Sequence, residues 1–303
     1  MDWLNYHHLL YFWLVAREGS LARAGAELRL SQSAISGQIR ALENSLGEKL
    51  FVKRGRRLVL SETGRVVYHY ADEIFTLGKE LQDTLKDRPM GRPLRVTIGV
   101  ADVVPKLIAR ELIEPALKLP GPVRLICREN KPDRLLAELA LHELDVIITD
   151  DPASPQVKVK AFNHLLGECD IVFLASPDLV PGYRDRFPSS LNDAPVLLPS
   201  ENTSLRRALD QWFEENDIRP QVVGEFEDSA LMNVFGQKGM GLFPTASIIA
   251  EEVKRQQRVD VVGRVRDVKQ RFYAVTVERK LVHPAAAAIC REAGKILSRG
   301  AEP

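Results

Sequence analysis

Cysteine is scarce in this sequence, and long apolar runs are absent. The three cysteines, Cys127, Cys169 and Cys290, are far apart and form no Cys-x-x-Cys pair, which argues against a disulfide framework or a zinc site and for a reducing compartment. The first thirty residues lack a basic-then-apolar leader with a small-residue cleavage site. No uninterrupted apolar stretch reaches the roughly 18 residues that a membrane helix needs. We therefore expect a cytoplasmic protein with no membrane partner.

Net charge is also nearly absent, and only its distribution is informative. The formal charge is +1 over 303 residues. Residues 1–65 hold ten Lys and Arg against six Asp and Glu, so the rest of the chain carries a small acidic excess. A basic head on a mildly acidic body is typical of a phosphate-binding module attached to a domain with another task.

No set of residues for catalysis or for a cofactor is evident. Gly236, Gly239 and Gly241 lack the spacing of a nucleotide-binding loop and precede Leu-Phe-Pro rather than a helix. The histidines form no recognisable Asp/His/Ser arrangement. We expect neither an enzyme nor a bound cofactor. A secreted solute-binding receptor is also disfavoured, because it would need an export signal and no basic head.

What is present begins with three short helices and a hairpin within residues 1–61. Apolar residues recur with helical spacing, and the expected helices cover residues 5–17, 21–28 and 31–46. Ser20 and Ser31 are candidate N-caps, and Gly47 is a candidate left-handed C-terminal residue. Two apolar runs, 50–52 and 58–60, flank a cationic tip and predict a β-hairpin. These elements make a winged helix-turn-helix.

A long helix follows over residues 62–92. Alternating spacings of three and four connect Val67, Tyr70, Ile74, Leu77, Leu81 and Thr84, which is the stripe of a coiled coil. Pro89, Gly91 and Pro93 end the helix as a linker. We expect residues 67–85 to pair two chains into a dimer. Packing of the stripe against one domain of the same chain is the alternative.

Residues 93–303 alternate between strands and helices, which predicts an α/β domain with parallel strands. The elements expected first are strands over 94–100, 123–128 and 145–149, and helices over 103–118 and 132–142. After Gly167 the pattern resumes with strands over 171–175, 196–198, 222–226 and 272–277, and helices over 205–215, 230–235 and 284–297. We therefore expect two lobes with a cleft between them, lobe I over residues 93–166 and 268–303 and lobe II over residues 167–267.

The third helix has the properties of a helix that reads DNA. Such a helix needs short polar side chains in its first turns and cations where phosphates run. The candidate DNA contacts on it are Ser31, Gln32, Ser33, Ser36, Gln38 and Arg40. The hairpin tip adds Lys53, Arg54, Arg56 and Arg57, which suit the minor groove or phosphates. A capped amphipathic helix with a solvated face is the alternative, and the cationic tip argues against it.

Residues 5–65 resemble the N-terminal domain of LysR-type transcriptional regulators. The likeness is carried by Leu21-Ala22-Arg23-Ala24-Gly25, Ser31-Gln32-x-x-x-Ser36-x-Gln38-Ile39-x-x-Leu42-Glu43, Leu46-Gly47-x-x-Leu50-Phe51, Arg56-Arg57 and Leu60-Ser61-x-x-Gly64. The resemblance implies double-stranded operator DNA as a partner and a two-lobed, periplasmic-binding-protein-like α/β effector domain. Gly37 departs from the Arg usual in the family, so one phosphate contact is missing or comes from elsewhere.

Over nearly the whole chain, the sequence is similar to the branch of that family that activates sodium/proton antiporter genes. The fragments that carry this likeness are Asn5-Tyr6-x-His8-Leu9-x-Tyr11-Phe12-Trp13, residues 37–43, residues 99–102, and Gly224-Glu225-Phe226-x-Asp228-x-Ala230-Leu231-Met232. The likeness implies a homotetrameric activator, a response to sodium and contact with RNA polymerase. A regulator of a metabolic operon that senses a small organic ligand is the alternative.

The effector is expected in the cleft, where strand carboxyl ends and helix N-termini meet. The candidate effector contacts are Ala101, Asp102, Asn130, Thr149, Asp150, Ser200, Thr203, Phe226, Glu227 and Asp228. These loops carry several carboxylates and no Lys or Arg, which favours a cation held by oxygens. We expect Na⁺ or a cationic ligand near Asp102, Asp150 and Asp228. Alternatively, Asp102 and Asp228 are helix N-caps, a duty that Asp150 does not have.

Overall fold

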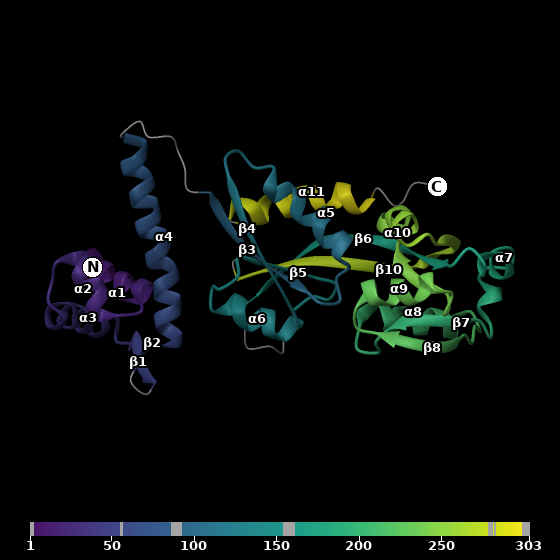
Figure 1. Cartoon of the computed structure of the whole chain (residues 1–303), viewed down its shortest axis with the longest axis horizontal. Helices are drawn as coiled ribbons and strands as arrows, with labels where there is room; N and C mark the ends of the chain where they lie inside the picture. The colour runs from purple at the N-terminus through teal and green to yellow at the C-terminus, as the bar shows by residue number, and fades with distance from the viewer. Residues whose placement is uncertain are drawn as a thin grey trace. The chain divides into compact units, whose positions relative to one another are not determined.

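The computed structural model describes residues 3–54, 57–85, 93–153, 161–277, 281 and 283–298. Contacts between residues divide the chain into two units (Figure 1). One unit contains Met1–Arg92 with Leu141–Glu143, and the other contains Pro93–Ala140 with Leu144–Pro303.

The N-terminal unit has the predicted helix-turn-helix and hairpin. Its elements are α1 (Tyr6–Glu18), α2 (Leu21–Leu28), α3 (Gln32–Leu46), β1 (Phe51–Arg54), β2 (Arg57–Leu60) and α4 (Glu62–Leu85). β1 pairs antiparallel with β2, with Phe51 opposite Leu60, which confirms the predicted wing. A core of buried side chains from all four helices and the start of the wing includes Leu9, Phe12, Ile35, Leu42 and Ala71.

Local signals explain where these helices begin and end. Ser31 Oγ accepts a hydrogen bond from the backbone N–H of Ala34, as an N-cap does. Gly47 ends α3 with φ +72°, a conformation that costs a glycine little. The expectation for Ser20 was wrong in part, because it precedes α2 but its side chain makes no capping hydrogen bond.

The stripe on α4 is divided between two surfaces. Val67 and Ile74 pack against the core of the N-terminal unit. Leu77 and Leu81, further along the helix, are 68% and 62% exposed. The side chain of Thr84 lies outside the described residues. Val67 and Ile74 therefore pack within their own unit, whereas Tyr70, at 48% exposure, and the two leucines present apolar side chains at the surface.

The second unit is an α/β domain of two lobes. Its strands are β3 (Leu94–Ala101), β4 (Val123–Asn130), β5 (Val146–Thr149), β6 (Phe162–Ala175), β7 (Pro195–Pro199), β8 (Gln221–Phe226), β9 (Phe243–Ala246) and β10 (Asp260–Thr276). Its helices are α5 (Lys106–Leu117), α6 (Pro132–Ala140), α7 (Val180–Tyr183), α8 (Ser204–Glu215), α9 (Ser229–Gln237), α10 (Ala250–Gln257) and α11 (Pro284–Ser298), with short 3₁₀ turns at Ser189–Leu191 and Ser247–Ile249.

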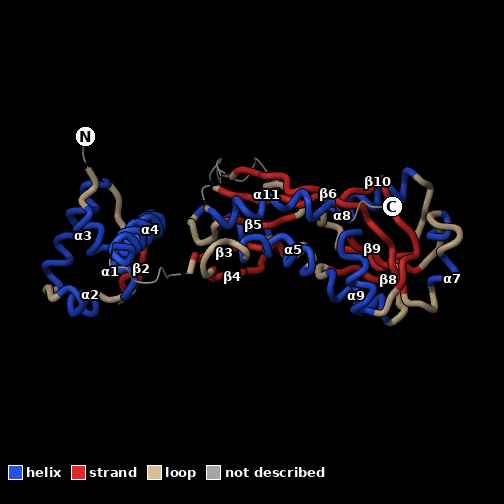
Figure 2. Tube along the Cα trace, turned by 90° about the horizontal axis from the view of Figure 1, so that it is seen from above, coloured by secondary structure: helices blue, strands red, loops and turns tan. Residues whose placement is uncertain are grey.

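The main sheet is mixed, not parallel as the strand order had predicted. The strands lie in the order β4-β3-β5-β10-β6-β9, with β3 parallel to β4 and β5. β10 is antiparallel to both of its neighbours, β5 and β6. The reason is that β6 and β10, of 14 and 17 residues, run side by side through both lobes (Figures 1 and 2). These two strands are the connection between the lobes.

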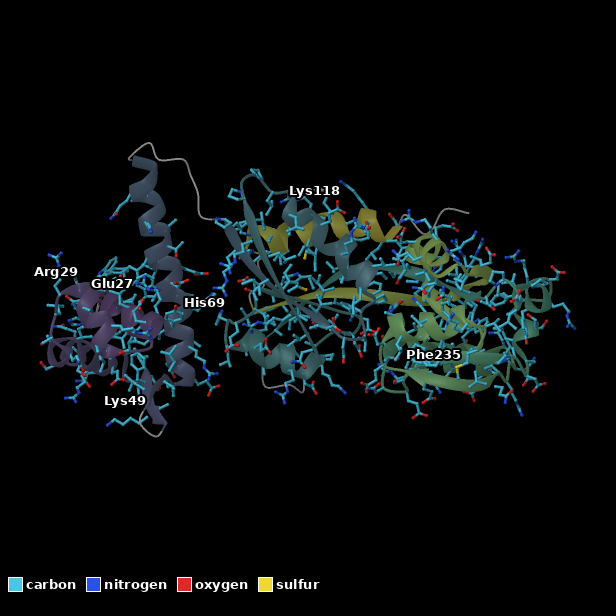
Figure 3. The ribbon with its side chains drawn as sticks, in the orientation of Figure 1. Glu27, Arg29, Lys49, His69, Lys118 and Phe235 are labelled. Carbon is cyan, nitrogen blue, oxygen red and sulfur yellow. The ribbon has the colours of Figure 1, made fainter. Side chains whose placement is uncertain are left out.

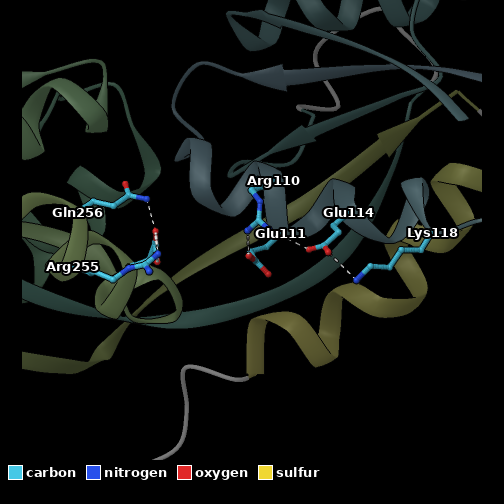
Figure 4. A network of polar contacts seen from close by, with 7 residues as sticks. Arg110, Glu111, Glu114, Lys118, Arg255 and Gln256 are labelled. Atoms are coloured by element: carbon cyan, nitrogen blue, oxygen red, sulfur yellow. Dashed lines mark hydrogen bonds and ion pairs between the residues drawn. The ribbon is translucent and has the colours of Figure 1, made fainter.

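The helices cover both faces of the lobe I sheet, with α5 and α11 on one side and α6 on the other (Figure 1). On the exposed side of α5, Glu114 lies 3.8 Å from Arg110 and 2.9 Å from Lys118 (Figure 4). Arg255 on α10 is 2.7 Å from Glu252. Exposed pairs of this kind contribute about 0–1 kcal/mol each, so the stability of the α/β domain rests on its apolar core.

Candidate functional site

The exposed face of α3 presents the predicted polar side chains. Ser31, Gln32, Ser33 and Arg40 are exposed, and Ser36 and Gln38 are half-buried. The opposite face contributes Ile35, Ile39 and Leu42 to the core. Helix α3 is therefore anchored in the core by one face and available to a partner on the other.

Of the four exposed side chains, two have no partner within the described part of the chain. No hydrogen bond or ion pair engages Gln32 or Arg40 there, whereas Ser31 Oγ caps α3 and lies 3.0 Å from Ser33 Oγ. A glutamine amide can bond an adenine edge with two hydrogen bonds, and an exposed arginine suits a phosphate. Of the wing, Lys53 is exposed, while Arg56 and the side chains of Arg54 and Arg57 lie outside the described residues.

Glu43 fixes α3 to the start of the wing. Its carboxylate is 7% exposed and accepts hydrogen bonds from the backbone N–H of Leu50 at 2.9 Å and from Lys49 Nζ at 2.7 Å. Lys49 is labelled in Figure 3. Burial alone would raise the pKa of Glu43, but these donors and the N–H of Phe51 outweigh it and lower that pKa. The orientation of the wing relative to α3 therefore depends on an ionised glutamate.

Between the two lobes lies a small cavity of about 40 Å³. It is formed by the ends of strands and the beginnings of helices from both lobes. The lining residues are Val103, Pro105, Asp150, Pro199, Thr203, Leu205, Phe226, Glu227, Ser229, Met232, Pro244, Thr245, Ala246 and Gln270. A water molecule occupies about 30 Å³ of liquid, and pockets for drug-sized ligands measure about 300–1,000 Å³. In this conformation the cavity has room for an ion or a few atoms.

Asp150 follows β5 directly, and its carboxylate lines the cavity. Its side chain is buried, at 5% exposure. Ser204 Oγ donates a hydrogen bond to its Oδ2 at 2.7 Å. Burial raises the pKa of Asp150, and neighbouring Asp151 raises it further, while the Ser204 hydroxyl opposes the shift. The ionised form of Asp150 is therefore only partly compensated by its neighbours.

Gln270, on β10, is a cavity residue that the sequence did not point out. It is 4% exposed, and its Oε1 accepts no hydrogen bond from any described residue. Leaving a buried acceptor unpaired costs about 1–3 kcal/mol. Gln270 lies opposite Cys169 on the neighbouring strand β6. Burial raises the pKa of the Cys169 thiol to about 12, so that thiol stays protonated. The polar lining of the cavity thus offers mainly oxygen acceptors.

The structure brings together some of the predicted effector contacts. Asp150, Thr203, Phe226 and Glu227 line the cavity. The predicted residues absent from its lining are Ala101, Asp102, Asn130, Thr149, Ser200 and Asp228.

Asp102 and Asp228 satisfy backbone donors of their own loops. Asp228 Oδ1 accepts from the N–H of Ala230 at 2.6 Å and caps α9, and Asp102 Oδ1 accepts from the N–H of Val103 at 3.1 Å. In the described parts of the chain, no group of three or more His, Cys, Asp or Glu side chains could hold a metal ion. A site that joins Asp102, Asp150 and Asp228 is therefore not assembled here.

The crevice is not free of cations, contrary to the sequence-based expectation. Arg206 Nη1 lies 2.9 Å from Glu225, Arg207 lies 3.0 Å from Asp151, and Lys131 lies 3.5 Å from Glu227. These cations come from α8 and from the turn before α6, so the sequences of the acidic loops did not reveal them. Three of the acidic residues are thereby paired with cations, and Asp150 is left with a hydroxyl partner.

Among the residues that the structure describes, three pairs of polar side chains join the lobes around the cavity. They are Ser204 to Asp150, Arg207 to Asp151, and Lys131 to Glu227. The first is partly buried and the other two are exposed. A species that competes with Ser204 for Asp150 would act directly on one of the contacts that hold the lobes together.

Comparisons with known proteins match both units. Residues 6–65 match the profile of the bacterial regulatory helix-turn-helix protein, lysR family, and residues 91–295 match the LysR substrate binding domain. The transcriptional activator protein NhaR of Escherichia coli (strain K12) is 36% identical over 96% of this chain and 95% of its own length.

Solved structures share the fold at lower identity. ArgP from Mycobacterium tuberculosis is 18% identical, with a TM-score of 0.62 over 96% of each chain. LysG from Corynebacterium glutamicum, solved at full length with the effector Arg bound, is 19% identical, with a TM-score of 0.60 over 95% of this chain and 98% of its own. None of the helices in the described segments is both long and apolar enough to span a membrane.

Proposed function

This chain belongs to the LysR family of bacterial transcriptional regulators, and from that premise we propose that it activates specific promoters under the control of a small effector bound between its lobes. The observation that carries the proposal is the face of α3, where Gln32 and Arg40 are exposed and free of partners among the described residues. A regulator needs such side chains at the DNA, and a structural helix does not.

We propose that two chains pair through the C-terminal half of α4. Leu77 and Leu81 are apolar and strongly exposed there, whereas Val67 and Ile74, nearer the start of α4, already pack against the core. Pairing would present two copies of α3 to successive major grooves about 34–36 Å apart, or multiples of that distance. Association of dimers into a tetramer and contact with RNA polymerase are further parts of this proposal, taken from the family resemblance.

Selection of DNA from a random pool tests the DNA-binding part. The full chain should enrich a partly palindromic sequence, and footprinting should protect two half-sites separated by whole helical turns. Enrichment of no sequence, or a single unpaired half-site, would contradict the proposal.

For the effector, we propose a compact cation, with Na⁺ as the first candidate. Asp150 and Gln270 offer a carboxylate and an unpaired carbonyl oxygen, and the volume of about 40 Å³ suits an ion. Oxygen donors of this type bind hard cations. We centre the site on Asp150, because Asp102 and Asp228 already bind backbone N–H groups.

A small organic effector with a cationic or N–H-donating head group is the second candidate. Its support is the apolar part of the lining, which includes Leu205, Phe226 and Met232. Such a ligand would require the lobes to separate further, which breaks the contacts of Arg207 and Lys131 across the cleft.

Thermal unfolding of the full chain distinguishes the two candidates. NaCl and choline chloride are compared at equal ionic strength, because phosphate-binding proteins respond to salt as such. A higher unfolding temperature in Na⁺ that disappears in Asp150→Asn would support the ion. Equal temperatures in the two salts, together with a rise on adding arginine or another small amine, would support the organic ligand instead.

A further inference from the structure

Gly37 lies in the middle of α3, at the position that projects furthest from the core. At about 100° per residue, it is nearly opposite the line of Ile35, Ile39 and Leu42. Ser33 and Arg40, four residues before it and three after it, are its neighbours on the exposed face. The outermost point of the candidate reading surface (α3 in Figure 1) is therefore a residue without a side chain.

Packing does not require a glycine at this position. A Cβ on Gly37 would have no heavy atom within 4 Å beyond its own helix, and the backbone is helical. Two other glycines of the unit differ, because a Cβ on Gly25 would lie 2.8 Å from the Leu30 carbonyl oxygen and one on Gly64 would overlap the Leu50 carbonyl oxygen. Glycine inside a helix costs about 1 kcal/mol relative to alanine. The fold would be more stable with alanine at residue 37.

The side chains around Gly37 are too short to read DNA from a distance. The hydroxyls of Ser33 and Ser36 extend one atom beyond Cβ. A helix with its side chains is about 10–12 Å wide, and the major groove is about 12 Å wide, so the depth at which the helix sits decides what these hydroxyls reach. Removing the most projecting side chain allows a deeper position.

We infer that Gly37 is the point of closest approach between α3 and DNA, and that its missing side chain lets Ser33 and Ser36 contact base edges. DNA atoms take the volume that a Cβ would fill. This inference rests on the proposed docking of the exposed face of α3. It makes Gly37 a determinant of specificity, although it has no functional group of its own.

The test compares Gly37→Ala with the matched variant Gly294→Ala in the full chain. Gly294 is an exposed glycine inside α11 whose added Cβ would also have no heavy atom within 4 Å. Both variants should unfold at the same or a higher temperature than the wild type. Affinity for a DNA fragment selected by the wild type should fall at least tenfold in Gly37→Ala and stay unchanged in Gly294→Ala.

The affinity of Gly37→Ala for random-sequence DNA shows whether the variant loses contacts to base edges or loses DNA binding in general. The inference predicts a clearly larger loss on selected DNA than on random DNA, since base edges are contacted only on the selected site. Equal losses on both DNAs, or unchanged affinity of Gly37→Ala for selected DNA, would overturn it. A wild type that selects no DNA would instead overturn the proposed function, and the inference with it.

Discussion

Glu43 and Asp150 are buried carboxylates, one in each unit, and their surroundings move their pKa values in opposite directions. Glu43 accepts hydrogen bonds from Lys49 and from the backbone N–H groups of Leu50 and Phe51, which lower its pKa despite burial. For Asp150, burial raises the pKa, and Asp151 adds to the shift while Ser204 opposes it only in part. The first carboxylate is compensated by the protein, whereas the ionised form of the second is only partly compensated.

This difference separates a structural group from a candidate functional group. A buried charge that hydrogen bonds compensate stays ionised and holds two elements together. An under-compensated charge next to a cavity responds to whatever enters, because the charged form gains most from a new cation.

Glu43→Ala should destabilise the N-terminal unit by about 3 kcal/mol, since it removes the acceptor of two backbone N–H groups and of Lys49. Hydrogen exchange in the full chain would show the loss in peptides from α3 and β1. Asp150→Asn, which keeps an oxygen for Ser204, serves as the comparison and should leave those peptides unchanged. Equal protection of α3 in Glu43→Ala and the wild type would contradict the structural role.

Gln32→Ala should weaken binding to selected DNA by about 1–3 kcal/mol, or roughly 5- to 150-fold, and relax the preference at one base pair. Arg40→Ala should weaken selected and random DNA alike and reduce the salt slope by about one. Titrations at several salt concentrations measure both. A loss of specificity from Arg40→Ala, with none from Gln32→Ala, would reverse the roles given to these residues.

Asp228→Ala should cost about 1 kcal/mol of stability through the lost cap on α9, with no change in the response to effector. Denaturant unfolding measures the first effect, and operator affinity with and without Na⁺ measures the second. If the variant abolished the response to Na⁺, Asp228 would be an effector ligand, and the site centred on Asp150 would be incomplete.

The smallest effects concern pH, and they have opposite signs. Because the pKa of Glu43 is lowered on folding, its contribution to stability is present above the ordinary pKa of Glu and is lost as pH falls through the lowered value. Because the pKa of Asp150 is raised, its contribution is present below the ordinary pKa of Asp and is lost as pH rises through the raised value.

Hydrogen exchange corrected for intrinsic rates at each pH tests these signs. Acidification should lower protection near β1 and raise it near β5 and the start of α8. Glu43→Gln and Asp150→Asn should each flatten the matching profile. Parallel profiles in both regions would contradict the contrast.

The two regions also differ in how far the sequence predicted them. The cap at Ser31, the left-handed Gly47 and the polar face of α3 are local signals, and the structure agrees with each. Gln270 was missed because the expected strand began at residue 272, whereas β10 begins at Asp260 and is interrupted by an irregularity between Val265 and Lys269 that breaks its alternation. A cavity assembled from distant segments leaves no contiguous pattern.

The cations of the crevice were missed for the same reason. Arg206 and Arg207 lie a few residues after the loop that holds Ser200 and Thr203. The salt bridge between Lys131 and Glu227 joins residues 96 positions apart. Only the folded chain shows that they neutralise Glu225, Asp151 and Glu227. The sequence alone therefore predicted a more acidic cleft than the structure shows. Asp150 remains a better candidate for contact with an effector than Asp102 or Asp228.

The role of Asp150 is tested most directly by the change in operator affinity when Na⁺ replaces choline at constant ionic strength, measured on the full wild-type chain and on Asp150→Asn. Coupling between two sites of a protein is typically about 1–3 kcal/mol, or roughly 5- to 150-fold. We expect a change of at least fivefold in the wild type and none in Asp150→Asn. A change of equal size in both proteins, or no change in the wild type, would contradict that role.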